Sequence, residues 1–142
     1  MQPGNIWSGS KTLARFTNPT ELARKKGRLT TSYPIEWRGQ QWPDVETAYQ
    51  ETKRNRRSCW QMTLKERAYL LVEIMEVKFR TYPELIEEIR TAGGQQWIIR
   101  CSHHTGARTN AFQVWEGDGP ESLFVRCLSE VYRRITGEAR PR

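Results

Sequence analysis

The 142-residue sequence contains little histidine and little cysteine, and this scarcity limits the chemistry it can carry. Its two histidines are neighbours, His103 and His104, and its three cysteines, Cys59, Cys101 and Cys127, lie far apart. A zinc site needs three or four ligands in workable spacing, so we expect no metal site. An odd number of widely spaced cysteines is not a disulfide framework and favours a reducing compartment. We therefore expect a cytoplasmic protein.

The sequence also lacks long hydrophobic runs. None approaches the length of a membrane span, and we expect no signal peptide, lipid anchor or membrane association. The glycines of GGQQ and GDGPE match no phosphate loop or dinucleotide fingerprint, so we expect no cofactor. The length and the 37% of hydrophobic residues fit one domain, residues 1–142, with one modest core.

Acidic residues are outnumbered, with 16 Asp and Glu against 23 Lys and Arg, which gives a net charge of +7. A basic balance favours anionic partners such as nucleic acid or phosphorylated nucleotides. The basic clusters at 24–26, 54–57, 133–134 and 140–142 are equally typical of solvated helix ends. Six tryptophans are many for this length, and their flat faces suit stacking on rings, so we expect some of them to line a concave surface.

The pattern along the chain predicts an α+β fold that is mainly helical with a few short strands. We expect a loop up to about Leu13 and a basic tail at 137–142. Asn18 and Gly27 are predicted to cap and end a short first helix, and Arg38-Gly39 to turn a hairpin within 32–42. Further helices are predicted at 45–53, 63–79, 82–90 and 120–135, and short strands at 95–102 and 111–115.

The helix predicted at 63–79 is the clearest in the chain. Thr63 and Glu66 have the spacing of a capping box at its start. Its apolar stripe consists of Leu64, Ala68, Leu71, Val72, Met75 and Phe79.

The stretch VETAYQETK, residues 45–53, places polar side chains where a helix usually carries its apolar stripe. Glu46, Tyr49, Gln50 and Lys53 have the spacing i, i+3, i+4, i+7, so they share one helix face. This face either points to water or lines a pocket. In a pocket, the Gln50 amide and the Tyr49 phenol could bind hydroxyl groups of a ligand. The Lys53 amine could contact a phosphate or a carbonyl carbon.

Glu46 is the candidate catalytic group of this face. Asp44 is a good N-cap, which puts Glu46 at the second helical position, where free N–H groups and the helix dipole favour the carboxylate form. A carboxylate there could orient a water molecule or oppose a developing cation. These roles suit chemistry at a sugar carbon with an oxocarbenium-like transition state.

The segment WPDVETAYQETK resembles the motif W-x-x-V-E-H-x-Y-Q-x-x-K of the NADAR, or YbiA-like, proteins. The resemblance covers roughly residues 33–135. Four further segments occur in the same order as in that family. YPIEWRGQQW leads to the motif, and MEVKFRTYPELIEEIRTAG, WIIRCS and CLSEVYRRI follow it.

The resemblance implies a YbiA-like α+β fold and N-glycosidase activity on an N-ribosyl bond. The substrates it implies are phosphorylated ribosyl nucleotides or ADP-ribose attached to guanine in nucleic acid. By motif position it implies Glu46 as the catalytic carboxylate, with Lys53 as a second catalytic candidate that could form an imine. The implied substrate-binding residues are Trp42, Tyr49, Gln50, Lys78 and Trp115.

The chain departs from the family pattern at several positions. Thr47 replaces the usual histidine, Arg100 replaces an acid, and Ser122 and Val125 stand where Asn and Gly are usual. These departures leave open a non-catalytic module that binds ADP-ribose-like ligands or nucleic acid. The segment HHTGARTN, 103–110, is either an exposed turn or a substrate loop on which Arg108 meets a phosphate.

Overall fold

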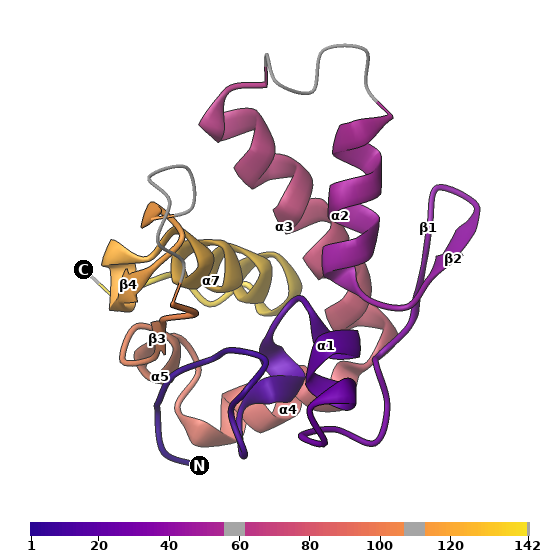
Figure 1. The fold of residues 1–142 in the computed structure, drawn as a ribbon. Helices are drawn as coiled ribbons and strands as arrows, with labels where there is room; N and C mark the ends of the chain where they lie inside the picture. Colours follow the sequence, from indigo (N-terminus) through magenta and orange to yellow (C-terminus); the bar gives the residue numbers. More distant parts are fainter. Residues whose placement is uncertain (56–61, 107–112, 142) are drawn as a thin grey trace.

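The computed structural model describes residues 1–55, 62–106 and 113–141. The elements within these ranges form a single α+β domain that is mainly helical, as predicted (Figure 1). In chain order they are η1 (Ala14–Phe16), α1 (Thr20–Lys25), β1 (Ile35–Trp37), β2 (Gln40–Trp42), α2 (Val45–Arg54), α3 (Leu64–Thr81), α4 (Pro83–Ala92), α5 (Gln95–Ile98), β3 (Ser102–His103), β4 (Gly117–Asp118), η3 (Gly119–Glu121) and α7 (Leu123–Thr136).

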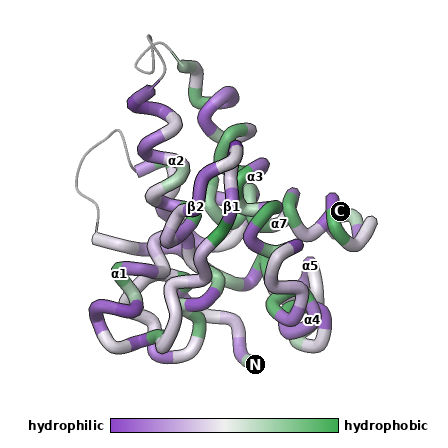
Figure 2. The backbone as a smooth tube through the Cα atoms, turned by 90° about the vertical axis from the view of Figure 1, so that its right-hand side faces the viewer, coloured by the Kyte–Doolittle hydropathy of each residue, from purple (hydrophilic) through white to green (hydrophobic). Residues whose placement is uncertain are grey.

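The core lies between α3 and α7, the longest helices of the described chain. The start of α3 is set by the predicted capping box, in which Thr63 and Glu66 exchange side-chain to backbone hydrogen bonds. Hydrophobic stretches recur along α3 and α7, whereas α2 is mostly hydrophilic (Figure 2). The predicted apolar stripe of α3 is correct except at its first residue, Leu64, which is 44% exposed.

Asp44 joins the starts of α1 and α2. Its Oδ1 accepts the backbone N–H of Thr47 at 2.8 Å and its Oδ2 accepts the N–H of Glu21 at 2.8 Å. The prediction that Asn18 caps α1 is therefore wrong, because the Asp44 carboxylate, 23 residues after Glu21 in the sequence, fills that role. The predicted capping of α2 by Asp44 is confirmed.

The predicted hairpin turns at Arg38 and Gly39, both with positive φ (50° and 77°). These are the values of the two-residue hairpin turn whose twist matches the strands. The indole N–H of Trp42 donates to the carbonyl of Trp37 at 3.2 Å, and the Arg38 guanidinium lies 4.9 Å from the centre of the Trp37 ring. Both tryptophans therefore brace the hairpin.

The predicted strand at 95–102 is wrong over most of its length, since 95–98 form helix α5 and only 102 and 103 form strand β3. Short apolar runs fit a buried helix as well as a strand. Long-range bonds decide the outcome, because the Gln95 side chain donates to the Ser129 carbonyl at 2.9 Å and its backbone N–H donates to Glu138 at 3.0 Å.

The second predicted strand, 111–115, is also wrong where the structure describes it. Residues 113–115 form a helical turn, and the strand that pairs with β3 is Gly117–Asp118. The N-terminal segment has no helix or strand of its own up to Leu13, as expected, but Ile6 is fully buried and its N–H donates to Ser102. Within the described part of the chain, every helix is too short or too polar to cross a bilayer.

Candidate functional site

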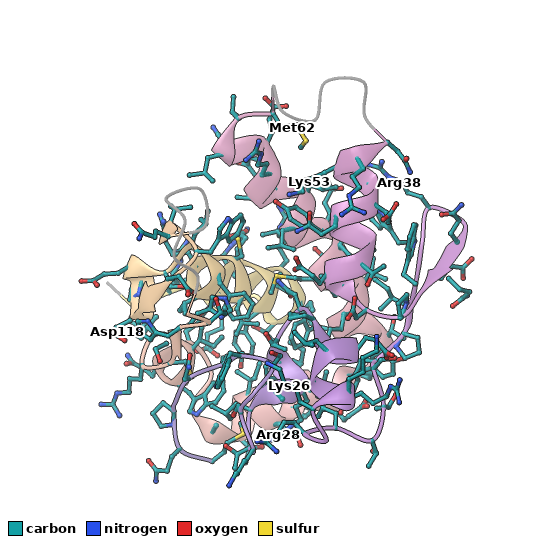
Figure 3. The ribbon with its side chains drawn as sticks, viewed as in Figure 1. Lys26, Arg28, Arg38, Lys53, Met62 and Asp118 are labelled. Carbon is teal, nitrogen blue, oxygen red and sulfur yellow. The ribbon has the colours of Figure 1, made fainter. Side chains whose placement is uncertain are left out.

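A cavity of about 580 Å³ lies beside α2, and the polar face of that helix lines it. Glu46, Tyr49, Gln50 and Lys53 all line it, so the structure brings together the four side chains whose spacing marked them in the sequence. Figure 3 shows Lys53 on the side of α2 away from the β1–β2 hairpin. The interpretation of this face as plain solvated surface is therefore wrong.

The Glu46 carboxyl group lies in the cavity within a fixed local geometry. Its Oε1 accepts a hydrogen bond from the side-chain amide of Gln50 at 2.8 Å, and the backbone N–H of Glu46 donates to the carbonyl of Asn18 at 3.3 Å. Burial raises the pKa of Glu46, and the nearby Asp44 adds to that rise against the opposing effects of Gln50 and Lys53. The expected preference for the carboxylate form is therefore wrong in direction. The local backbone donors are already used by Asn18 and Asp44, and desolvation dominates.

Tyr49 forms part of the cavity wall, with its ring between a cation and an indole. The Lys53 amine lies 4.5 Å from the centre of the Tyr49 ring, and Trp115 packs edge to face against it at 6.5 Å. Burial raises the pKa of the phenol to about 12, so Tyr49 remains a neutral hydrogen-bonding group at physiological pH. Trp115, predicted to contact substrate, lines the same cavity.

Among the described residues, three cationic side chains line the cavity: Lys53 and Arg54 at the end of α2, and Arg67 in the first turns of α3. Arg54 is exposed and pairs with Glu51 at 2.9 Å. The Nε of Arg67 is buried and has no hydrogen-bond partner among the described residues. Sequence reasoning missed Arg67, because its place in the exposed first turns of an amphipathic helix gives no signal.

Thr17 and Asn18, which sequence reasoning also missed as site residues, line the cavity beside Glu46. Both are buried, and Thr17 Oγ1 and Asn18 Oδ1 have no hydrogen-bond partner among the residues of the described ranges. Buried polar atoms of native proteins are nearly always paired. Orphaned atoms at the wall of a cavity are consistent with a ligand that supplies the missing partner.

Lys78 does not line this cavity, contrary to the prediction that it adds a charge there. It is fully buried, and its amine donates to the carbonyls of Arg15 at 2.6 Å and Thr17 at 2.8 Å. Burial lowers its pKa to about 7. Lys78 instead fixes the backbone that leads to Asn18, and so shapes the cavity wall from behind.

Trp42 is not among the cavity-lining residues either, because its indole N–H is held by the hairpin. The predicted contact at Arg108 lies outside the described residues. The structure therefore gathers five of the predicted site residues around one cavity: Glu46, Tyr49, Gln50, Lys53 and Trp115.

Across the cavity from α2, the lining comes from β3, the segment before β4 and the start of α7, and it includes His103, Thr105, Glu116 and Phe124. Figure 1 shows β3, β4 and α7 to the left of α2. His103 is stacked on Phe124 with ring centres 4.3 Å apart. His103 therefore belongs to a packed wall and not to an exposed turn.

Comparison with protein-family models, with curated proteins and with solved structures finds no match for this chain. Among the described residues, no three His, Cys, Asp or Glu side chains gather as they would around a metal ion.

Proposed function

We propose that this protein is an N-glycosidase that hydrolyses an N-ribosyl bond. ADP-ribose on guanine in DNA is the preferred substrate, and a related ribosylated nucleotide is the second. The observation that carries the proposal is that Glu46 and Lys53 line one cavity of about 580 Å³. That volume lies within the range of roughly 300–1,000 Å³ usual for small-molecule sites.

The raised pKa of Glu46 fits the first step of such a reaction. When the bond between the anomeric carbon and nitrogen breaks, its electron pair goes to the nitrogen and positive charge develops on the ribose. A carboxyl group that holds its proton above the usual pH can protonate that nitrogen. The carboxylate then left beside the ribosyl cation stabilises it electrostatically until water adds.

The other lining groups fit a nucleotide. Tyr49 and Trp115 offer aromatic surface for stacking, and Lys53, Arg54 and Arg67 offer positive charge for phosphate oxygens. Lys53 has an alternative covalent role, in which its amine forms an imine with a ring-opened ribose. Reductive trapping with cyanoborohydride distinguishes the two roles, because only an imine leaves the substrate attached to the protein.

The basic surface favours a nucleic-acid substrate over a small metabolite. Leu22 of α1 lines the cavity, and the same helix ends in the basic residues Arg24 and Lys25. Figure 3 shows Lys26 and Arg28 at this end of the molecule. A small nucleotide needs charge only inside the pocket, whereas a nucleic-acid backbone meets charge beyond it. A base within a duplex would have to leave the stack before cleavage.

The experiment incubates the protein with a single-stranded oligonucleotide that carries one ADP-ribosylated guanine and measures free ADP-ribose by anion-exchange chromatography. We expect release by the wild type and a loss of about a hundredfold or more in Glu46→Gln, the effect usual for a general acid. Glu51→Gln is the matched control, because Glu51 lies on the same helix, outside the cavity. It should retain wild-type activity.

Two outcomes oppose the proposal. Equal release by the wild type and Glu46→Gln removes Glu46 from the chemistry. Salt-dependent binding of the oligonucleotide without release by either protein identifies a binding module instead.

A further inference from the structure

His103 and Glu116 form a pair on the cavity wall formed by β3 and the segment before β4. His103 Nε2 lies 3.7 Å from Glu116 Oε2, and both residues line the cavity that contains Glu46. Their side chains are only 12% and 15% exposed. The pair is therefore largely shielded from bulk water and faces the same volume as the catalytic candidate.

The ring of His103 is held in one orientation and one tautomer. Its Nδ1 lies 2.7 Å from the carbonyl oxygen of Ile6, and because a carbonyl only accepts, Nδ1 carries a hydrogen. Stacking on Phe124 fixes the plane of the ring. In the neutral form, Nε2 therefore carries the lone pair, on the edge that faces Glu116.

The side chain of Glu116 is also held in a fixed position. Its Oε1 accepts both the backbone N–H of Thr105 at 2.7 Å and the Thr105 hydroxyl at 2.8 Å. Its other oxygen, Oε2, is the one nearest His103 Nε2. At 3.7 Å the two atoms are too far apart for a hydrogen bond, but a proton taken up by Nε2 would face this anionic oxygen. The negative charge of Glu116 therefore stabilises the protonated form of His103.

We propose that His103 and Glu116 together act as the proton acceptor for the attacking water in the cavity, opposite the proton donor Glu46. The assignment rests on the proposed N-glycosidase function. His103 is then a catalytic residue that touches the water, and Glu116 is a positioning residue that acts through His103.

The step balances without a further reactant. An O–H bond of water breaks as its oxygen bonds to the anomeric carbon, and the proton passes to His103 Nε2. The bond from that carbon to nitrogen breaks with its electron pair on nitrogen, which takes the proton of Glu46. Exchange with solvent then returns one proton to Glu46 and removes one from His103.

The environments of the two groups agree with this division of labour. Burial lowers the pKa of His103, and the neighbouring His104 lowers it further, against the bond to Ile6 and the charge of Glu116. The pKa of Glu46 is raised. Opposite shifts of two groups in one site are the usual mark of an acid and a base. They widen the pH range in which Glu46 is protonated while His103 is neutral.

The first test is independent of activity. Side-chain nitrogen NMR of the full-length protein should show His103 with its hydrogen on Nδ1, and Glu116→Gln should shift its titration to lower pH. His104, which is exposed and bonds Asp118 at 2.8 Å, provides the matched comparison through Asp118→Asn. That variant should leave the His103 titration unchanged. A neutral ring with its hydrogen on Nε2, or no shift in Glu116→Gln, overturns the pairing of His103 with Glu116.

The second test measures the release of ADP-ribose from the modified oligonucleotide across pH. The wild-type kcat/KM should rise as His103 loses its proton, and that limb should move to lower pH in Glu116→Gln. His103→Gln should lose about a hundredfold in kcat and lack the limb, whereas His104→Gln should keep the limb and the wild-type kcat above it. Binding of free ADP-ribose should persist in every variant, which separates loss of folding from loss of catalysis.

The two proposals fail differently. An active wild type whose pH profile is unchanged in His103→Gln and Glu116→Gln overturns the base assignment and leaves the glycosidase in place. A wild type that releases nothing overturns the glycosidase and with it the base assignment, while the NMR result still decides whether Glu116 stabilises the protonated form of His103.

Discussion

The side-chain amide of Gln50 donates to Oε1 of Glu46 at 2.8 Å, one turn further along α2. This bond favours the ionised carboxyl group, but desolvation outweighs it and raises the pKa of Glu46. Between the ordinary pKa and the raised one, the folded state holds a proton that the unfolded state has lost. The free energy of unfolding therefore falls as pH rises through that window.

Glu46→Gln should remove this pH dependence. As pH rises from 4 to 7, we expect the free energy of unfolding of Glu46→Gln to increase relative to that of the wild type. Each unit of pKa shift corresponds to about 1.4 kcal/mol. Gln50→Leu should enlarge the pH dependence by removing the donor that opposes the shift. Urea unfolding at several pH values measures both. A Glu46→Gln variant whose stability decreases relative to that of the wild type as pH rises would contradict the raised pKa.

Asp44 should be the most costly helix cap to remove, because its carboxylate serves two helices. One oxygen caps α2 at Thr47 and the other holds the N–H of Glu21 in α1. Loss of one cap costs about 1 kcal/mol, so Asp44→Ala should cost about 2 kcal/mol and lower Tm by roughly 5 °C.

Thr63→Ala is the single-cap control for this prediction, since the Thr63 hydroxyl accepts one backbone N–H in α3, that of Glu66 at 3.1 Å, and its bond to the Glu66 carboxylate is exposed. Calorimetry of both variants makes the comparison. Equal losses from Asp44→Ala and Thr63→Ala would show that the second bond of Asp44 contributes nothing.

Lys78 should give the protein a distinct alkaline stabilisation. Its pKa is about 7 in the folded state, against an ordinary value of 10.5. Between these values the unfolded state binds the extra proton, so the free energy of unfolding rises with pH. The neutral amine still has two N–H donors, which match the carbonyls of Arg15 and Thr17. The stabilisation therefore need not cost either hydrogen bond.

Lys78→Met should abolish this rise while lowering stability at pH 9 by about 2 kcal/mol, since two buried carbonyls lose their donor. Denaturation of both proteins at pH 6.5 and pH 9 tests the prediction. Lys25→Met, at an exposed position, is the control and should keep the wild-type slope. A wild type whose stability is flat between these pH values would refute the depressed pKa.

Local signals predicted much of the fold, and long-range contacts account for what they missed. Asp44, the Thr63 capping box and the Arg38-Gly39 turn depend on neighbouring residues, and the structure follows all three. The local pattern places Gln95 in a strand, because its bonds to residues 129 and 138 leave no trace in that pattern.

The same distinction applies to the candidate site. Glu46 and Lys53 could be found because one helix carries both at the spacing of a single face. Asn18 and His103 enter the cavity from other segments, so no period connects them to α2. The sequence places Lys78 on the correct helix, but the direction of its side chain depends on carbonyls that precede it by more than 60 residues.

Asn18 should trade stability for binding. Its backbone carbonyl is fixed by the N–H groups of Thr20 at 3.0 Å and Glu46 at 3.3 Å, so its side chain is held rigidly in the cavity wall. Its Oδ1 is buried without a hydrogen-bond partner among the described residues. An unpaired buried polar atom costs roughly 1–3 kcal/mol, and a ligand hydroxyl that donates to it removes that cost.

Asn18→Ala should therefore weaken the binding of ADP-ribose by about tenfold, the equivalent of one such hydrogen bond. Its free energy of unfolding should stay level or rise, because an unsatisfied group has been removed. Isothermal titration and urea unfolding provide the two measurements, with the exposed Asn55→Ala as the matched control for both. A variant that loses stability while keeping its affinity would show that Asn18 stabilises the fold. The hydrogen-bond donors of the ligand would then have to bind to other groups in the cavity.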